Sequence, residues 1–321
     1  MSYNTNFQNL TVAAPVSPAL LGASLPSMQR TLAKQVECSG IGVHSGDQVN
    51  MRLCPAEENT GIVFVRTDLS NGARTIKAQW DHVIDTKLCT VIGNPHGGKV
   101  ATIEHLMSAL FACGVDNARI EIDGGEVPVM DGSANAFVFL IEVAGTVEQD
   151  AARCEIEILS PVEVTENGKT VRLSPSDVTR YSVTIDFDRA PIMTQSCDVI
   201  LSQTSFKNEI SRARTFGFFE EVDQMQKMGL ARGGSLDNSI VIKGQDILNE
   251  GGLRFSNEFA RHKVLDAIGD LALAGMPIRG HFEGNRCGHA LNNKLLHALF
   301  AAPEAWRAVT MMRPAPDAVV A

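Results

Sequence analysis

Histidine and carboxylate residues at helical spacing give the first indication of chemistry in this chain. In the stretch 259–270, FARHKVLDAIGD, the residues His262, Asp266 and Asp270 recur every four positions. At about 100° per residue they share one side of a helix with Lys263, while apolar residues occupy the other side. Taken alone, this pattern is explained most simply by a solvated polar face with a weak i,i+4 contact.

A second long helix changes this assessment. Glu104 and His105 lie near the start of segment 102–114, whose other residues are mostly apolar or small. If the two helices pack against each other, His105, His262 and Asp266 provide three nitrogen and oxygen ligands and leave a fourth position for water, as in catalytic zinc sites. The helix dipole also keeps a histidine near a helix N-terminus neutral, as a ligand must be. We therefore expect one zinc ion per chain between the helices.

Nearby residue types fit the remaining steps of a metal-assisted hydrolysis. A carboxylate next to a ligating histidine can take the proton of the attacking water, which makes Glu104 a candidate general base. Considered alone, Glu104 is better explained as a helix-start glutamate favoured by the dipole, and only the adjacent His105 and the two ligands of the second helix change this assessment. His289 follows Gly288 at a strand-to-helix turn and can donate a proton to a leaving amine, with Asp270 keeping it protonated. Thr215, in SRARTFGF, offers a hydroxyl to an oxyanion, although such runs are often exposed helix starts.

The composition excludes several other classes of function. The chain has 321 residues, a formal charge of −9 and a pI near 5.4, with no Lys/Arg-rich run, so no nucleic-acid partner is expected. Its seven cysteines include no CxxC pair, which indicates a reducing compartment and leaves a metal site to histidines and carboxylates. No apolar run approaches the roughly 20 residues that span a bilayer. Neither GxGxxG nor GxxxxGK[ST] follows a strand, which argues against a dinucleotide or P-loop enzyme.

The chain reads as two halves with the same order of parts. In each half a histidine-bearing helix ends in glycine and is followed by a strand, a turn and a second helix, which predicts an α+β fold built from two similar domains. Thr102 is expected to cap the first helix, and residues 146–153 are expected to form a linker. The expected helices are 102–114, 134–145, 257–275 and 290–300. The expected limits are a disordered leader at 1–27, domains at 28–149 and 150–305, and a tail at 306–321.

Four motifs, TIEHL, SRARTFGF, RHKVLDAIGDL and GHALNNKLL, resemble in this order the UDP-3-O-acyl-N-acetylglucosamine deacetylase family, the zinc amidases of lipid A synthesis. The segments SGIGVHSG, PVMDGSANAF and GLARGGSLDN also resemble it, so the likeness runs from about residue 28 to about residue 305. The resemblance implies two similar domains, each a helix layer packed on a β-sheet, with the active site between them. It implies zinc at His105, His262 and Asp266, and roles for Glu104 as base and His289 as acid, supported by Asp270.

The resemblance also implies how the substrate is bound. Thr215 matches a hydroxyl that contacts the reacting carbonyl oxygen, and GLARGGSLDNSIVI matches the lining of a passage for an acyl chain. Arg232 stands in this segment where a more apolar residue is expected. The implied substrate contacts are Phe216, the cation Lys263, Leu88 and Cys89 at the rim, and Gly234 and Ser235 in the passage. The implied reaction removes the N-acetyl group of UDP-3-O-(3-hydroxyacyl)-N-acetylglucosamine and releases acetate.

Some alternatives stay open at this point. A zinc amidohydrolase of the same fold can act on a different N-acyl sugar, because a fold does not determine its substrate. A binding protein without catalysis is disfavoured, because no group of the constellation is missing. The nucleotide-sugar substrate implies a cytoplasmic enzyme of a Gram-negative cell, near the inner membrane face. A further hypothesis is that a regulatory protease recognises the apolar tip of the tail.

Overall fold

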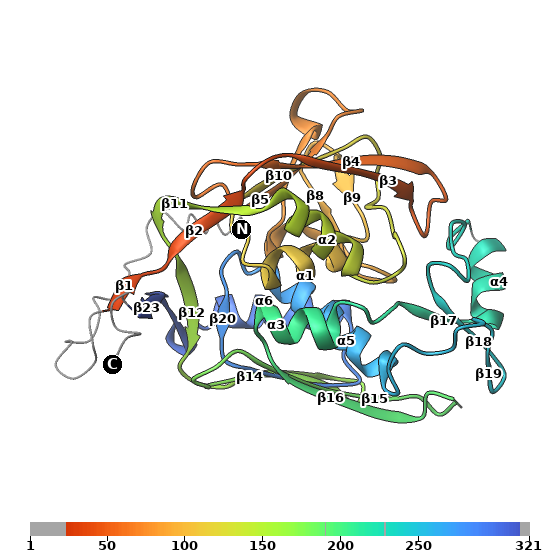
Figure 1. The fold of residues 1–321 in the computed structure, drawn as a ribbon. Helices are drawn as coiled ribbons and strands as arrows, with labels where there is room; N and C mark the ends of the chain where they lie inside the picture. Colours follow the sequence, from red (N-terminus) through yellow and green to blue (C-terminus); the bar gives the residue numbers. More distant parts are fainter. Residues whose placement is uncertain (1–23, 190, 228, 315–321) are drawn as a thin grey trace.

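Two five-stranded sheets enclose a layer of helices (Figure 1). This computed structural model describes residues 24–189, 191–227 and 229–314. The first sheet runs in the order β3 (Val36–Ile41), β4 (Gln48–Pro55), β10 (Ala118–Ile122), β5 (Ile62–Arg66) and β6 (Thr75–Lys77). The second runs in the order β13 (Val162–Glu166), β14 (Lys169–Ser174), β21 (His281–Asn285), β15 (Arg180–Asp186) and β16 (Thr194–Ile200).

The two sheets have the same pattern of strand directions. In each sheet one neighbouring pair is parallel, β10 with β5 and β21 with β15, and the other three pairs are antiparallel. Buried and exposed residues alternate along β4 and β15, because successive side chains of a strand point to opposite faces. One face of each sheet therefore packs on the helices, and the other faces outward.

The helices that carry the histidines lie between the sheets. They are α1 (Glu104–Ala112) and α5 (Glu258–Ala272). Each is followed along the chain by a second helix, α2 (Asn135–Ala144) after α1 and α6 (His289–Ala301) after α5. Helix α1 packs directly on α5, and the crossing is close: a Cβ added at Gly269 would lie 1.9 Å from the carbonyl oxygen of Glu104. No side chain larger than hydrogen fits there, so Gly269 lets the two helices bring their polar residues together.

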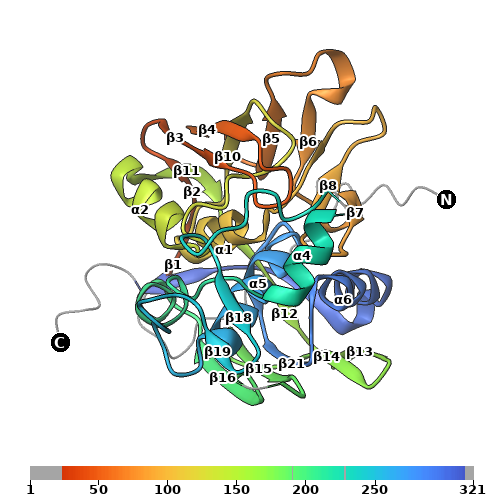
Figure 2. The ribbon, with the colours of Figure 1, turned by 90° about the vertical axis from the view of Figure 1, so that its right-hand side faces the viewer.

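Shorter elements complete the fold. Figure 2 shows α4 and β17–β19 in front of the end where α1 meets α5. The remaining helical segments are α3 (Gln203–Ser205), α4 (Phe219–Lys227), the π-helix η4 (Phe206–Ile210), and the 3-10 helices η2 (Asn71–Ala73), η3 (Trp80–His82) and η5 (Pro303–Ala305). The remaining strands are β1 (Ser24–Pro26), β2 (Met28–Leu32), β7 (Val83–Asp85), β8 (Val91–Gly93), β9 (Lys99–Val100), β11 (Thr146–Ala152), β12 (Cys154–Ile158), β17 (Phe216–Phe218), β18 (Ile240–Lys243), β19 (Asp246–Ile247), β20 (Ile278–Arg279), β22 (Trp306–Thr310) and β23 (Met312–Pro314).

The mixed α+β class and the four expected helices are confirmed, but two local expectations are wrong. Thr102 does not cap α1; the N-cap is Ile103, and Thr102 has a positive φ of 58°. The expected linker is the strand β11, which pairs with β2. The polar side of α5 is not solvated, which excludes the simplest explanation of this helix taken alone: His262, Asp266 and Asp270 are all buried.

Both ends of the described chain are more ordered than expected. β1, placed in the expected leader, pairs with β23, and β22, placed in the expected tail, pairs with β12. The rest of the leader and tail, 1–23 and 315–321, lies outside the described residues. Within the described ranges, no helix is both long enough and apolar enough to cross a membrane.

Candidate active site

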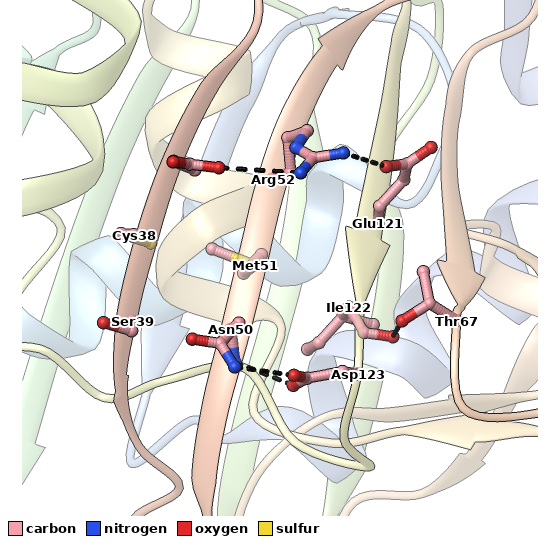
Figure 3. A pocket seen from close by; sticks show the side chains of 10 residues that line it. Cys38, Ser39, Asn50, Met51, Arg52, Thr67, Glu121, Ile122 and Asp123 are labelled. Atoms are coloured by element: carbon pink, nitrogen blue, oxygen red, sulfur yellow. Dashed lines mark hydrogen bonds and ion pairs between the residues drawn. The ribbon is translucent and has the colours of Figure 1, made fainter.

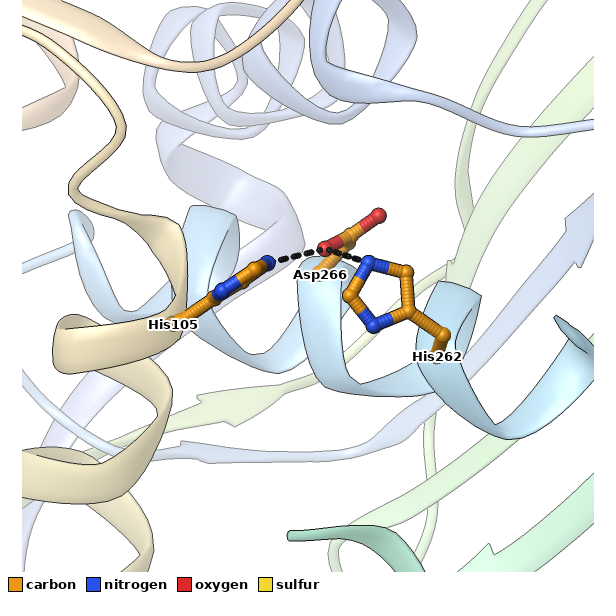
Figure 4. A group of neighbouring side chains, drawn as sticks. All are labelled: His105, His262 and Asp266. Atoms are coloured by element: carbon orange, nitrogen blue, oxygen red, sulfur yellow. Dashed lines mark ion pairs between the residues drawn. The ribbon is translucent and has the colours of Figure 1, made fainter. Parts of the chain in front are cut away.

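Three ligand-type side chains meet where α1 crosses α5. His105 comes from the first turn of α1, and His262 and Asp266 come from successive turns of α5 (Figure 4). Asp266 Oδ1 lies 3.6 Å from His105 Nε2 and 3.3 Å from His262 Nε2. One potential ligand atom from each residue lies within 4.8 Å of the others, and all three residues are buried. The two helices thus bring together the three residues predicted as ligands.

The residues present fit a zinc ion. Asp266 Oδ1 is buried and has no hydrogen-bond partner among the described residues, whereas Oδ2 accepts a hydrogen bond from Lys263 Nζ at 2.7 Å. A buried carboxylate oxygen without a partner is unfavourable unless a cation binds it. Two imidazole nitrogens and one carboxylate oxygen match the three protein ligands of many catalytic zinc sites.

The protonation states of these residues also suit metal binding. His262 Nδ1 donates a hydrogen bond to the Ala213 carbonyl oxygen at 3.1 Å, which leaves Nε2 free on the side of Asp266. Burial lowers the pKa of His262 to about 3, despite the opposing effect of Asp266. Burial alone would raise the pKa of Asp266, but His262 and Lys263 hold it well below its usual value. At neutral pH the imidazole is therefore neutral and the carboxylate charged.

Glu104 occupies the first turn of α1, beside His105. Its side chain is buried, Oε2 accepts a hydrogen bond from the Thr90 backbone nitrogen at 3.1 Å, and Oε1 lies 3.8 Å from His289 Nε2. Burial raises the pKa of Glu104, and the nearby histidines only partly oppose this shift. A carboxylate with a raised pKa inside a cavity is a candidate for proton transfer near neutral pH.

His289 is the first residue of α6, and its ring faces the Glu104 carboxylate. Its Nδ1 donates to Asp270 Oδ2 at 2.9 Å. Asp270 also accepts hydrogen bonds from Thr90 Oγ1 at 2.5 Å and from Asn292 Nδ2 at 2.9 Å. Burial would lower the pKa of His289, but the charge and hydrogen bond of Asp270, together with the charges of Glu104 and Asp266, outweigh it and raise that pKa to about 9. The imidazole is therefore held protonated at neutral pH, with Nε2 directed toward Glu104.

A cavity of about 480 Å³ opens from this cluster. Glu104, His105, His262, Asp266 and His289 line one end of it. The walls beyond them are mainly apolar and come from residues 215–248, including Phe216, Val222, Met225, Leu236, Val241 and Leu248. The arrangement combines a metal-binding group, a proton acceptor and a proton donor at the head of an apolar passage.

A second cavity, of about 470 Å³, lies on the outer face of the first sheet, between β3, β4 and β10 (Figure 3). Its charged side chains are paired with one another: Arg52 lies 3.1 Å from Glu121 and 3.6 Å from Glu37. Asn50 Nδ2 donates to Asp123 at 2.7 Å. These charged and amide groups therefore satisfy each other.

Comparison with known proteins identifies the family of the chain. The sequence profile of the UDP-3-O-acyl N-acetylglycosamine deacetylases matches residues 29–301, most of the chain. The chain belongs to this family. Its members are zinc-dependent deacetylases of lipid A biosynthesis, and deacetylation of a UDP-3-O-acyl-N-acetylglucosamine is the activity of this enzyme.

Individual relatives agree over nearly their whole length. The UDP-3-O-acyl-N-acetylglucosamine deacetylase of Acidithiobacillus ferrooxidans is 51% identical over 284 residues, which cover 88% of this chain and 92% of the relative. The enzyme of the same name from Phenylobacterium zucineum is 47% identical over 291 residues, 91% of this chain and 99% of the relative. The Neisseria meningitidis enzyme is 47% identical over 283 residues, 87% and 92% of the two chains.

The deacetylase cavity contains most of the other residues predicted to contact the substrate. These lining residues are Leu88, Thr215, Phe216, Gly234, Ser235 and Lys263. Cys89 is buried and is not among the lining residues, and burial raises the pKa of its thiol to about 12, so its expected place beside Leu88 at the rim stays a prediction. Arg232 is exposed and is not among the lining residues either.

Some polar residues in and around the cavity received no role from the sequence, among them His44, Thr90 and Asn292. His44 lines the cavity, and Thr90 and Asn292 hold Asp270. The sequence contained a signal for two of these residues. His44 lies in SGIGVHSG, one of the segments that resemble the family, and Asn292 follows His289 by three residues on the same helix face. Thr90 has no such signal, because only the fold brings it next to α5.

Proposed function

We propose that the enzyme hydrolyses the N-acetyl amide of UDP-3-O-(3-hydroxyacyl)-N-acetylglucosamine with one zinc ion held by His105, His262 and Asp266. The observation that carries this proposal is the meeting of these three residues, with an unpartnered Asp266 Oδ1, at the head of an apolar cavity. When bound, zinc acts as a Lewis acid that polarises the amide carbonyl and acidifies water. The neutral imidazoles and the charged carboxylate support the same ligand set.

Different side chains around the ligands accept and donate the protons of the reaction. Glu104 accepts a proton from the water that attacks the acetyl carbon, a role that its raised pKa supports. The Thr215 hydroxyl donates a hydrogen bond to the carbonyl oxygen as negative charge develops on it. His289, held protonated by Asp270, donates a proton to the amide nitrogen as the C–N bond breaks. The products are acetate and the free amine of the sugar.

The rest of the cavity is proposed to bind the substrate. The acyl chain enters the apolar passage along Phe216, Gly234 and Ser235, where glycine allows close contact with the backbone. Lys263 lies beside the reacting centre and supplies a positive charge to the nucleotide sugar. Leu88, partly exposed at the cavity wall, contacts the substrate at the rim.

We also propose that the chain is built from two similar domains, near 28–149 and 150–305, each a sheet covered by helices. The repeated pattern of strand directions and the chain order, in which α1 precedes β10 and α5 precedes β21, support this division. The active site then lies between the domains, since the ligands come from both. A cytoplasmic location near the inner membrane face follows from the proposed nucleotide-sugar substrate with its acyl chain. Recognition of the tail by a regulatory protease stays a proposal, because that tip lies outside the described residues.

Metal content and turnover, measured together, test the chemistry. We expect about one zinc per chain in the wild type, loss of zinc and turnover in His262→Ala, and retained zinc with turnover reduced by about 10²–10⁴-fold in Glu104→Gln. Full turnover of metal-loaded Glu104→Gln would refute the role of the base. Equal turnover of acylated and non-acylated UDP-N-acetylglucosamine would refute the acyl specificity.

A further inference from the structure

The residue before the N-cap of the catalytic helix has a strained backbone. Thr102 precedes Glu104 by two positions and has a φ of 58°. A branched side chain strongly disfavours this left-handed conformation, which persists only where its surroundings enforce it. Because the backbone at Thr102 sets the direction in which α1 begins, whatever enforces this conformation also sets the position of Glu104 and His105.

Glu126 is the residue that holds Thr102. Its carboxylate is buried, and Oε1 accepts a hydrogen bond from Thr102 Oγ1 at 2.9 Å. Backbone hydrogen bonds on both sides of Glu126 also hold Ala101, the residue before Thr102. The Ala101 backbone nitrogen donates to the Gly125 carbonyl oxygen at 2.9 Å, and the Val127 backbone nitrogen donates to the Ala101 carbonyl oxygen at 3.0 Å. Side chain and backbone together fix the turn that leads into α1.

The same carboxylate holds a second segment, the loop of residues 42–46. The backbone nitrogens of His44 and Ser45 donate to Glu126 Oε1 and Oε2 at 2.9 and 2.8 Å. A Cβ at Gly42 would lie 2.4 Å from Glu126 Oε2, so only glycine leaves room for the carboxylate. Three donors on two segments therefore satisfy this buried anion, which compensates the cost of burying it.

The loop 42–46 in turn contacts the proposed acyl passage. Gly233 donates to the Val43 carbonyl oxygen at 3.1 Å, and Arg232 donates to the His44 carbonyl oxygen at 3.3 Å. A Cβ at Gly233 would lie 2.3 Å from the Gly42 carbonyl oxygen, so the two backbones are in close contact. A continuous set of contacts thus runs from the passage wall through loop 42–46 and Glu126 to the start of α1.

We propose that Glu126 is a positioning residue of the deacetylation reaction. It holds Thr102 in its strained conformation, so that Glu104 is aimed at the reacting centre, and it links this turn to the segment that contacts the acyl chain. Glu126 is not among the residues that line the cavity, whereas Thr102 and His44 are. It therefore acts through its neighbours rather than on the substrate.

A rescue experiment tests the positioning role. Glu126→Gln replaces one acceptor oxygen with a donor that faces backbone N–H groups, and we expect kcat per metal-loaded chain to fall about 10- to 100-fold, as for a small misplacement of a catalytic group. Adding Thr102→Gly should restore much of this loss, because glycine adopts a positive φ without help from Glu126. Glu37→Gln, an exposed carboxylate substitution in the same half of the chain, is the matched control and should keep wild-type kcat.

Acyl-chain dependence provides a readout that a merely structural role would not change. Wild type and variants are compared on UDP-3-O-acyl-N-acetylglucosamines with a long and a short acyl chain. We expect the ratio of kcat on the long-chain substrate to kcat on the short-chain substrate to fall in Glu126→Gln, while a general loss of stability would leave this ratio unchanged. If Glu126→Gln does not fold, Thr102→Val removes the same hydrogen bond while Glu126 stays in place, and the same fall in kcat is expected.

The outcomes separate this inference from the proposed function on which it rests. Wild-type kcat in Glu126→Gln, or a double variant no more active than the single one, would overturn the role of Glu126 while leaving the zinc mechanism intact. Glu104→Gln, measured in parallel, addresses the base itself: full activity there would refute the proposed mechanism, whatever the Glu126 variants show.

Discussion

Replacing Asp270 by asparagine tests how the site keeps His289 protonated. Asp270 is buried, carries the charge nearest to the ring, and accepts the Nδ1 hydrogen bond at 2.9 Å. Asparagine has the same shape and retains an oxygen that can accept from His289, but it has no charge. The substitution thus isolates the electrostatic contribution of Asp270 from its contribution to packing.

The expected shift follows from the pKa values. Asp270 is the main cause that raises the pKa of His289 to about 9 against the effect of burial. Loss of one adjacent opposite charge lowers such a pKa by about one to three units, equivalent to about 1.4 to 4 kcal/mol. A general acid works only when protonated, so the alkaline limb of the profile of kcat/KM against pH should move to lower pH by that amount.

The acid limb should move in the same direction, but less. Burial is the largest cause of the raised pKa of Glu104, and Asp270 adds to it. A general base works only when deprotonated, so a lower pKa of Glu104 extends activity to lower pH. The profile of Asp270→Asn is therefore expected to move as a whole toward acid, with the larger displacement on its alkaline side.

The assay is kcat/KM between about pH 5 and pH 10 on metal-loaded protein, with the metal content of each variant measured in parallel. Asn292→Ala is the matched control, since it removes a neutral hydrogen bond to the same Asp270 oxygen and should move the alkaline limb by much less than a unit. An alkaline limb in Asp270→Asn that coincides with that of the wild type would refute the assignment of His289 as the acid held by Asp270.

Two further predictions concern the elements that position the site, both measured by urea unfolding. Gly269→Ala places a methyl group against the Glu104 backbone and should destabilise the fold by about 1–3 kcal/mol or more and reduce turnover. Gly251→Ala is the control and should do neither, because no atom lies within 4 Å of its added Cβ. Equal stability of the two variants would contradict the close helix crossing. Glu258→Gln removes a buried carboxylate that accepts a hydrogen bond from Arg214 Nε at 2.9 Å and should lower the free energy of unfolding by about 3–5 kcal/mol. Glu209→Gln, in an exposed ion pair, should lower it by under about 1 kcal/mol. Similar losses in the two variants would show that the buried pair contributes little to stability.

The long helices and the ligand set were predictable because both leave periodic signals. Apolar residues at helical spacing mark α1 and α5, and the polar residues that interrupt the apolar pattern are the ones that meet in the site. Asp266 and Asp270 repeat the spacing set by His262, so a single helix presents all three on one side. Spacing alone did not exclude a solvated face on α5. The adjacent Glu104 and His105 on a second apolar helix made the metal site the better prediction.

The parts that were missed depend on contacts distant in sequence. Thr102 is a good helix-capping residue by type, yet its hydroxyl bonds to Glu126, 24 residues away, and the cap position falls on Ile103. The residues of β11 are polar and alternate only weakly, and they become a strand because β2 offers an edge to pair with. Thr90 acquires its role only because Asp270, 180 residues away, is folded beside it.

The origin of the site residues explains why the chemistry requires the whole fold. α1 supplies Glu104 and His105, while α5 supplies His262 and Asp266. Each helix alone would present its polar groups to a core that cannot satisfy them, and such burial is unfavourable unless partners compensate it. The crossing at Gly269 brings the two incomplete sets within reach of each other, so the groups that would weaken each helix separately become the proposed ligands and proton-transfer groups of one site. Packing of the helix layer and assembly of the active site are therefore the same event.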